Sequence, residues 1–135
     1  MLFQSIGTSG SALTAERLRM DVISNNLANM DSTVTPGGNG PYQREVVFLA
    51  ARGTVDGVGT GVQVTAVTPD QSPPKEVYDP GNPQANTQGY VAYPNVNPVR
   101  EMVDLMDAVR AYEANVTTMG DAKTVDTQTM SIMRA

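Results

Sequence analysis

Residues 98–135 read PVREMVDLMDAVRAYEANVTTMGDAKTVDTQTMSIMRA, and they carry the strongest structural signal in the sequence. Mostly apolar residues recur in it at alternating spacings of three and four: Met102, Leu105, Val109, Tyr112, Val116, Met119, Lys123, Asp126, Met130 and Met133. That repeat keeps one seam of an α-helix against a partner helix. The helix would be about 57 Å long at about 1.5 Å per residue. The sequence therefore predicts a long helix that needs a second long helix, from this chain or from a neighbour.

The charges of this stretch are expected on its solvent side. They are Arg100, Glu101, Asp104, Asp107, Arg110, Glu113, Asp121 and Arg134. The spacing of Arg100 with Asp104, and of Asp107 with Arg110, predicts surface ion pairs worth about 0.2–0.5 kcal/mol each. Five threonines between residues 117 and 129 weaken an isolated helix. We therefore expect the final third of this helix to become ordered only against neighbouring subunits.

The first 31 residues form the second helical candidate. Ile6, Leu13, Met20 and Leu27 recur every seven residues, the same period as in the last stretch. An ordinary amphipathic helix on a small sheet would show a similar stripe. However, little of the intervening sequence could cover either stripe, which favours pairing between long helices.

Asparagines crowd the end of this candidate helix, in the run Ser24-Asn25-Asn26-Leu27-Ala28-Asn29. Asparagine amides compete for backbone groups and are poor helix formers. One interpretation is a frayed, solvated helix end. The sharper one is that the amides bond to the backbone at the turn or across a subunit contact.

The middle of the chain predicts a small β part. Residues 42–50 and 62–67 alternate in polarity as strands do and suggest one hairpin around a glycine-rich turn. Residues 68–89 hold five prolines and predict a stiff, extended connector. The fold class is thus mainly α with a small β part, in three segments: 1–31, 32–97 and 98–135.

Composition excludes several classes of function. The 135 residues carry a net charge of −5 with scattered basic residues, which argues against nucleic acid as a partner. With no Cys and no His, we expect no catalytic residues, no cofactor and no metal site, and we interpret the eight methionines as packing residues. No run of about 18 apolar residues predicts a membrane span, and the amino terminus lacks the pattern of a cleaved signal peptide.

Two motifs resemble those of the flagellar axial proteins, the family of rod, hook and hook-associated subunits. The amino-terminal motif is the asparagine run at residues 24–29 followed by Tyr42-Gln43-Arg44. The carboxy-terminal motif comprises residues 93–103 and 110–116. The short chain and the Gly/Pro-rich insert before Tyr42 narrow the resemblance to the proximal rod. Residues 98–101 depart from the pattern, because relatives commonly have an apolar residue and an acidic pair there.

The resemblance implies a structural subunit, not an enzyme. Its terminal helices would pair as an antiparallel coiled coil, and the middle would form a β-rich outer part. Subunits of this family leave through the flagellar type III export apparatus without signal cleavage. They assemble with other rod subunits in the periplasm into the shaft that carries torque to hook and filament.

Two alternatives remain open, another axial protein or a cytoplasmic coiled-coil adaptor. The assembly interface expected from the stripes and the motif consists of Ile6, Leu13, Met20, Asn25, Asn26, Leu27, Asn29, Met102, Leu105, Val109, Tyr112, Val116 and Met119.

Overall fold

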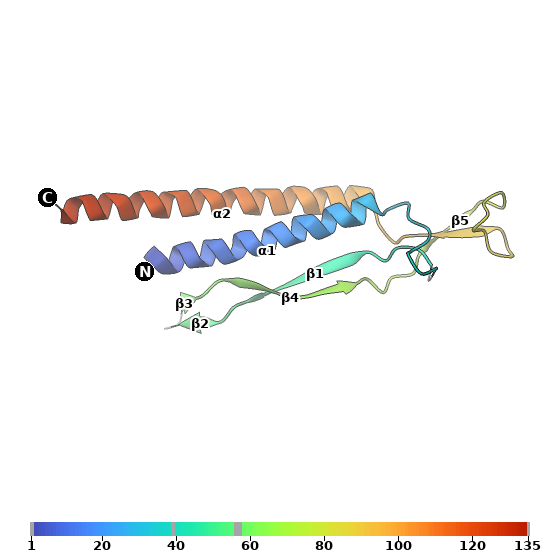
Figure 1. The fold of residues 1–135 in the computed structure, drawn as a ribbon, viewed down its shortest axis with the longest axis horizontal. Helices are drawn as coiled ribbons and strands as arrows, with labels where there is room; N and C mark the ends of the chain where they lie inside the picture. Colours follow the sequence, from blue (N-terminus) through green and yellow to red (C-terminus); the bar gives the residue numbers. More distant parts are fainter. Residues whose placement is uncertain (1, 39, 56–57, 135) are drawn as a thin grey trace. The chain divides into compact units, whose positions relative to one another are not determined.

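A computed structural model describes residues 2–38, 40–55 and 58–134 of the chain (Figure 1). The described elements are two long helices and six short strands, so the mainly helical fold class with a small β part is confirmed. In chain order they are α1 (Leu2–Ala28), β1 (Glu45–Ala51), β2 (Thr54–Val55), β3 (Val58–Gly59), β4 (Val62–Pro69), β5 (Lys75–Tyr78), β6 (Tyr90–Tyr93) and α2 (Pro98–Met133).

The start of α2 at Pro98 follows from local chemistry. Proline suits a first helical position, because its missing N–H would have no partner inside the helix. Asn97 caps the same end: its Oδ1 accepts the backbone N–H groups of Val99 at 3.1 Å and Arg100 at 3.3 Å. The predicted beginning of the long helix is therefore confirmed.

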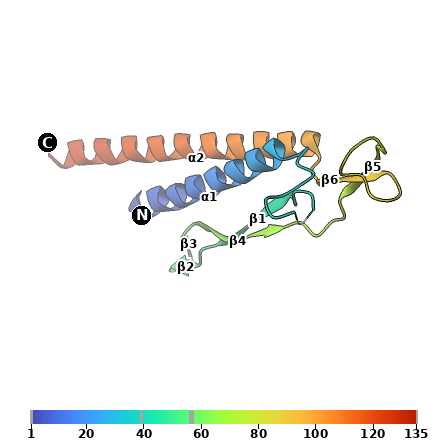
Figure 2. The ribbon, with the colours of Figure 1, turned by 45° about the vertical axis from the view of Figure 1, so that its right-hand side comes forward.

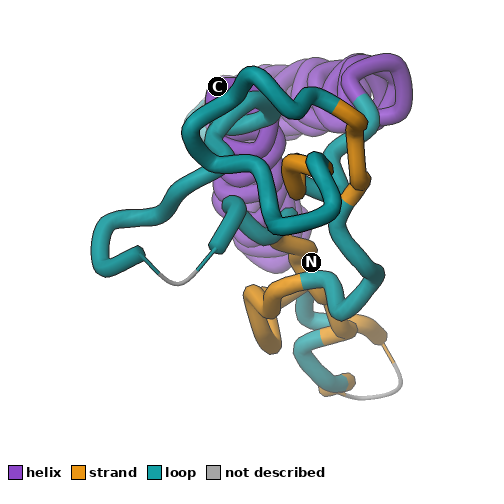
Figure 3. The backbone as a smooth tube through the Cα atoms, turned by 90° about the vertical axis from the view of Figure 1, so that its right-hand side faces the viewer, coloured by secondary structure: helices purple, strands orange, loops and turns teal. Residues whose placement is uncertain are grey.

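The strands pair in three two-stranded sheets: β1 with β4, β2 with β3, and β5 with β6. In Figure 3 they are short orange segments separated by longer loops. The predicted hairpin is confirmed as β1 and β4, and its turn is tightened by a bond from the Arg52 N–H to the Gly61 carbonyl at 2.8 Å. The miniature β2–β3 ladder occupies the predicted turn, with Thr54 opposite Gly59.

The sequence prediction missed strand β5, which lies inside the proline-rich connector. β5 and β6 are antiparallel, with Lys75 opposite Tyr93 and Tyr78 opposite Tyr90. The rings of Tyr78 and Tyr90 meet edge to face, with centroids 5.2 Å apart. Every proline of the connector lies outside Lys75–Tyr78, so the four residues keep the N–H groups that a ladder requires.

The chain divides into two compact units. Unit 1 comprises Met1–Met20, Val47–Ala66 and Met106–Ala135, and unit 2 comprises Asp21–Val46 and Val67–Leu105. Each unit contains a part of α1 lying beside a part of α2 (Figures 1 and 2). The division into segments 1–31, 32–97 and 98–135 stays a prediction.

Each unit buries few apolar side chains. Among the described residues, those of unit 1 are Ala15 and Ala108, and those of unit 2 are Val22, Ile23 and Val91. Small side chains at Ala15 and Ala108 remove little apolar surface from water, because burial scales with apolar area. The interior therefore stabilises the folded chain only modestly.

Within unit 1, Ser11 of α1 holds the start of β4. Its hydroxyl donates to the Thr8 carbonyl at 2.7 Å and accepts the backbone N–H of Val62 at 3.0 Å. Gly61 has a φ of +124°, and a Cβ there would overlap the Ser11 hydroxyl. Only glycine therefore fits this turn without strain.

We expect Gly61→Ala to lower the free energy of unfolding by about 2–3 kcal/mol, from backbone strain together with the overlap. Gly53→Ala is the matched control, because Gly53 has a φ of +117° but nothing within 4 Å of its would-be Cβ. Gly53→Ala should lower the free energy of unfolding by about 1 kcal/mol. Urea denaturation followed by circular dichroism measures both, and equal losses would show that the contact with Ser11 contributes nothing.

Candidate functional site

The side chain of Asn26 is at the centre of a polar network in unit 2 and is only 1% exposed. Its Nδ2 donates to the Glu45 carbonyl at 2.9 Å and to Glu101 Oε2 at 3.1 Å. Its Oδ1 accepts the Glu45 N–H and the Tyr42 hydroxyl, both at 2.9 Å. All the hydrogen-bonding capacity of the amide is thus used. The amide of Asn26 thus bonds to the backbone of Glu45 in β1 and not, as predicted, to the backbone at the turn.

The neighbouring Asn29 closes the end of α1. Its backbone N–H donates to the Asn25 carbonyl at 3.1 Å, and its Nδ2 donates to the same carbonyl and to the Asn25 Oδ1 at 3.0 Å each. The Ser32 hydroxyl donates to the Asn29 Oδ1. The helix end is therefore a bonded turn rather than a frayed one.

Arg44 forms the charged half of the same network. Its Nε donates to Glu101 Oε1 at 2.5 Å, its Nη1 lies 3.5 Å from Asp70 Oδ2, and its Nη2 lies 3.7 Å from Asp104 Oδ2. Glu101 is fully buried at 0% exposure, and the Arg44 side chain is 14% exposed. One guanidinium thus neutralises a buried carboxylate and collects two further acidic groups from the surface.

The expectation that Glu101 faces solvent is wrong, whereas the Asp104 side chain remains 32% exposed. Glu101 lies inside because Arg44 and Asn26 satisfy both of its oxygens there. Asp104 pairs with Arg44 and not with Arg100 as predicted. Among the described residues no ion pair joins the predicted partners Asp107 and Arg110 either.

Burial, neighbouring charges and hydrogen bonds shift the pKa values of three groups in this network. Burial raises the pKa of Tyr42, and the negative charges of Glu45 and Glu101 raise it further. Burial alone would lower the pKa of Arg44, but Glu101, Asp70 and Asp104 outweigh it, and the pKa lies above its usual value. Hydrogen bonds from Ser72, aided by Arg44, lower the pKa of Asp70.

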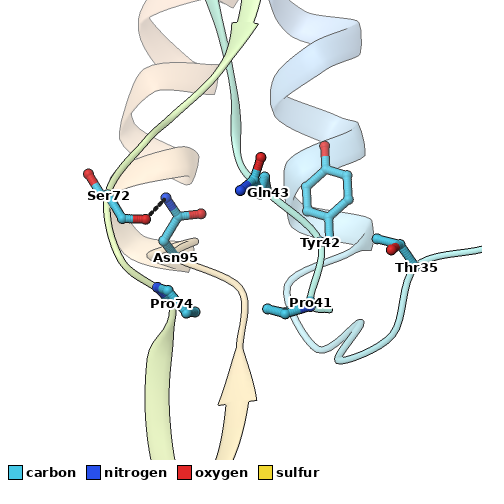
Figure 4. Close-up of a pocket in the computed structure, with 7 residues that line it drawn as sticks. All are labelled: Thr35, Pro41, Tyr42, Gln43, Ser72, Pro74 and Asn95. Atoms are coloured by element: carbon cyan, nitrogen blue, oxygen red, sulfur yellow. Dashed lines mark hydrogen bonds between the residues drawn. The ribbon is translucent and has the colours of Figure 1, made fainter. Parts of the chain in front are cut away.

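A pocket of about 330 Å³ adjoins the network (Figure 4). Asn95 lines it between Ser72 and Gln43. Its Nδ2 donates to the carbonyls of Asp70 at 3.4 Å and Ser72 at 3.2 Å, and its Oδ1 accepts the Arg44 N–H at 3.0 Å. This arrangement joins the 70–72 loop to Arg44, the residue before β1, and gives both polar atoms of the Asn95 amide a partner within the chain. Within residues 2–38, 40–55 and 58–134, no three His, Cys, Asp or Glu side chains are grouped to hold a metal ion.

The predicted seam of α2 is covered only in part by the chain itself. In unit 1, Tyr112 and Met119 are half-buried, whereas Val109 and Val116 are exposed, Val116 by 47%. Ala108 is buried in the place expected for Val109. In unit 2, Leu105 is half-buried but Met102 is exposed. Glu101 and Ala108 thus take the inner places predicted for Met102 and Val109, one residue earlier in each case. Leu105, Tyr112 and Met119 lie on the covered side as predicted.

The predicted positions of α1 are mostly half-buried: Ile6, Leu13, Met20, Leu27 and Asn29. Asn25 is exposed, and its amide donates to the Tyr42 hydroxyl at 3.4 Å. In unit 1, Gly10 approaches α2 closely enough that a Cβ would lie 3.7 Å from Met119 Cε. The expected interface residues thus include an exposed set, namely Asn25, Met102, Val109 and Val116.

Threonine hydroxyls along the later part of α2 bond to the helix itself. Thr117 and Thr118 donate to the carbonyls four residues earlier, and Thr124 and Thr129 do the same. Such bonds satisfy the hydroxyls but do not anchor the helix to any other element.

We expect hydrogen exchange of the isolated chain to be faster for amides 117–133 than for amides near Ala108, because the later side chains are mostly exposed. Mass spectrometry of deuterium uptake measures this directly. Protection from Val116 to Met133 as strong as that at Ala108 would contradict the expectation that this third is ordered by neighbours.

Two sequence profiles match the chain. Residues 6–36 match the family described as "Flagella basal body rod protein". Residues 87–132 match "Flagellar basal body rod FlgEFG protein C-terminal". The matches thus cover most of the two helices, including Asn26 and Glu101 of the polar network.

Curated relatives extend the similarity to almost the whole chain. The chain is 47% identical to the flagellar basal-body rod protein FlgC of Bacillus subtilis, over 90% of this chain and 91% of the relative. It is 41% identical to FlgC of Borreliella burgdorferi over 98% of both chains, and 46% identical to FlgC of Escherichia coli O157:H7 over 92% of both. Among the described residues no helix is long and apolar enough to cross a membrane.

Proposed function

Since this chain belongs to the FlgC family of flagellar basal-body rod proteins, we propose that it builds the proximal rod by burying its exposed helix faces against other subunits. It is a structural subunit of the basal-body rod, and membership of this family implies assembly with other rod components. The proposal concerns how the surfaces of the chain perform that role.

The observation that carries the proposal is the exposed apolar face of α2. In unit 1, Met106, Val109 and Val116 are all exposed, and their spacing places them on one face of the helix. Fully burying one such side chain contributes about 1.5–3 kcal/mol. Where this exposed face packs against a different surface of the next copy, the contact is heterologous and generates an open helical array.

In the assembled rod, α1 and α2 would pair as an antiparallel coiled coil whose outer face contacts neighbouring subunits. The expected interface residues of both helices divide accordingly: the half-buried ones hold the pair together and the exposed ones join subunits. Asn26 differs, because its amide is fully bonded within unit 2. Its part in assembly would be to fix the end of α1.

The proposal includes the route to the rod. The subunit would pass through the flagellar type III export apparatus unfolded and without a cleaved signal peptide. It would then fold on the growing rod in the periplasm and carry motor torque towards hook and filament. The small number of buried apolar side chains supports this route, because such a chain is unfolded at low cost.

We expect an epitope-tagged chain to co-purify with basal bodies from a strain in which it replaces the native gene. The same tag on a cytoplasmic protein is the control for adhesion to the preparation. Recovery of the tagged chain only in the cytoplasm of motile cells would contradict the proposal and favour a cytoplasmic coiled-coil adaptor.

A further inference from the structure

A groove of about 290 Å³ lies in unit 2, outside the polar network. Its apolar lining includes Met30, Val77, Tyr93 and Val96, and two charged residues, Asp31 and Lys75, also line it. Met30 and Val77 are exposed. An apolar hollow with a few charges is a surface that suits an apolar side chain followed by a charged one.

The last turns of α2 in unit 1 carry side chains of that kind. Ile132 and Met133 are each 76% exposed, the highest values among the large apolar side chains that the structure describes, and Met130 is also exposed. Met130 and Met133 lie three residues apart and share a face. Arg134 follows directly. We refer to residues 130–134 as the α2 tail.

One charged residue of the groove is complementary to the α2 tail, because Asp31 is acidic and Arg134 is basic. No ion pair in the described part of the chain involves Asp31 or Arg134. Lys75 lines this groove and also an adjoining pocket that contains Asn95 and Asn97. Asp31 lines the groove but not the adjoining pocket. A tail that enters beside Asp31 would therefore bring Arg134 to an unpaired carboxylate and Met133 to the apolar lining.

We propose that this groove binds the α2 tail of a second copy of the chain. Met133 occupies the apolar lining, and Arg134 pairs with Asp31. The inference rests on the proposed rod function and deepens it by naming one subunit contact. Because groove and tail are different surfaces, each copy offers one to the copy before it and the other to the copy after it, so the contact repeats along the rod.

The chain has no cysteine, so introduced thiols report this contact without background. Val77→Cys and Met133→Cys are placed in two differently tagged copies that are expressed together. Basal bodies are purified and oxidised. We expect a disulfide-linked dimer that carries both tags, since a thiol in the groove would lie beside a thiol on a neighbour's tail.

Val103→Cys replaces Val77→Cys in the control, because Val103 is also exposed in unit 2 but does not line the groove. We expect at least a tenfold lower yield of doubly tagged dimer from the control pair. Equal yields, or no dimer from the groove pair when both tagged copies are present in the basal bodies, would overturn the inference. Absence of the tagged copies from basal bodies would instead contradict the proposed function.

A charge exchange supplies the second measurement. Asp31→Arg should reduce the swimming radius in soft agar, and Arg134→Asp added to it should restore at least half of the loss, because the pair is then reversed but intact. Lys75→Glu is the comparison for a charge change at the groove without the predicted partner, and Arg134→Asp should not restore its motility. If Arg134→Asp deepens the defect of Asp31→Arg, the proposed pairing is wrong.

Discussion

Replacing Arg44 by methionine is expected to lower the free energy of unfolding by about 3–5 kcal/mol. The substitution keeps the length of the side chain but leaves Glu101, which is 0% exposed, without its counter-charge. When a buried carboxylate loses its partner, no interaction offsets the free-energy cost of removing the charge from water. Since the Arg44 side chain is 14% exposed, water reaches part of the site, and the lower end of the range is expected.

The partner substitution makes this prediction a double-mutant cycle. Glu101→Met alone should also destabilise, because Arg44 then lacks its shortest hydrogen bond. The double variant, with methionine at both positions, should lie within about 1 kcal/mol of the wild type, since apolar replacement of a buried pair is often neutral.

Urea denaturation of all four proteins measures the coupling, and Arg110→Met is the matched control. Arg110 is exposed on α2, the helix that carries Glu101, and forms no ion pair among the described residues. Its loss should change stability by less than about 0.5 kcal/mol. If Arg44→Met behaves like Arg110→Met, the network has no structural role.

The second large effect is expected from Val116→Asp, which should abolish rod assembly and motility. Val116 is 47% exposed in the chain alone, so the isolated variant should keep its helical content. In an assembled interface the same carboxylate would be buried without a partner, which costs far more than the lost methyl groups. Secretion should remain possible, because it does not depend on the assembled contact.

Thr118→Asp is the control for this experiment, because Thr118 is exposed on the same helix but does not share the face of Val116. Soft-agar motility, basal-body purification and circular dichroism of the purified variants give the three readouts. A motile Val116→Asp strain would refute the proposed docking face. Leu105→Asp should also stop assembly but is a weaker test, since Leu105 is half-buried within the chain.

The sequence predicts the two helices and the β1–β4 hairpin because their signals are local. The seven-residue period and the proline before Val99 define α2, and alternating polarity defines β1 and β4. The phase of the covered face was not predictable in the same way. Hydrophobicity favoured Met102 and Val109 for the inside, whereas the chain buries Glu101 and Ala108.

That difference arises from contacts between residues distant in the sequence. Glu101 is buried because it is bonded to Arg44 and Asn26, which lie 57 and 75 positions earlier in the sequence. Strand β5 was missed for a related reason, since its partner β6 follows a loop from Asp79 to Gly89. The Tyr42-Gln43-Arg44 motif and the asparagine run both pointed to residues of the network, but neither identified the acidic partners.

The scarcity of buried apolar side chains in both units has a mechanical consequence. Because the apolar side chains buried among the described residues are few and none is larger than Ile23, a single copy resists mechanical unfolding only weakly. It can be unfolded with little mechanical work and can refold once neighbouring subunits supply the contacts that it lacks alone. Rigidity then belongs to the finished shaft and not to any single piece of it.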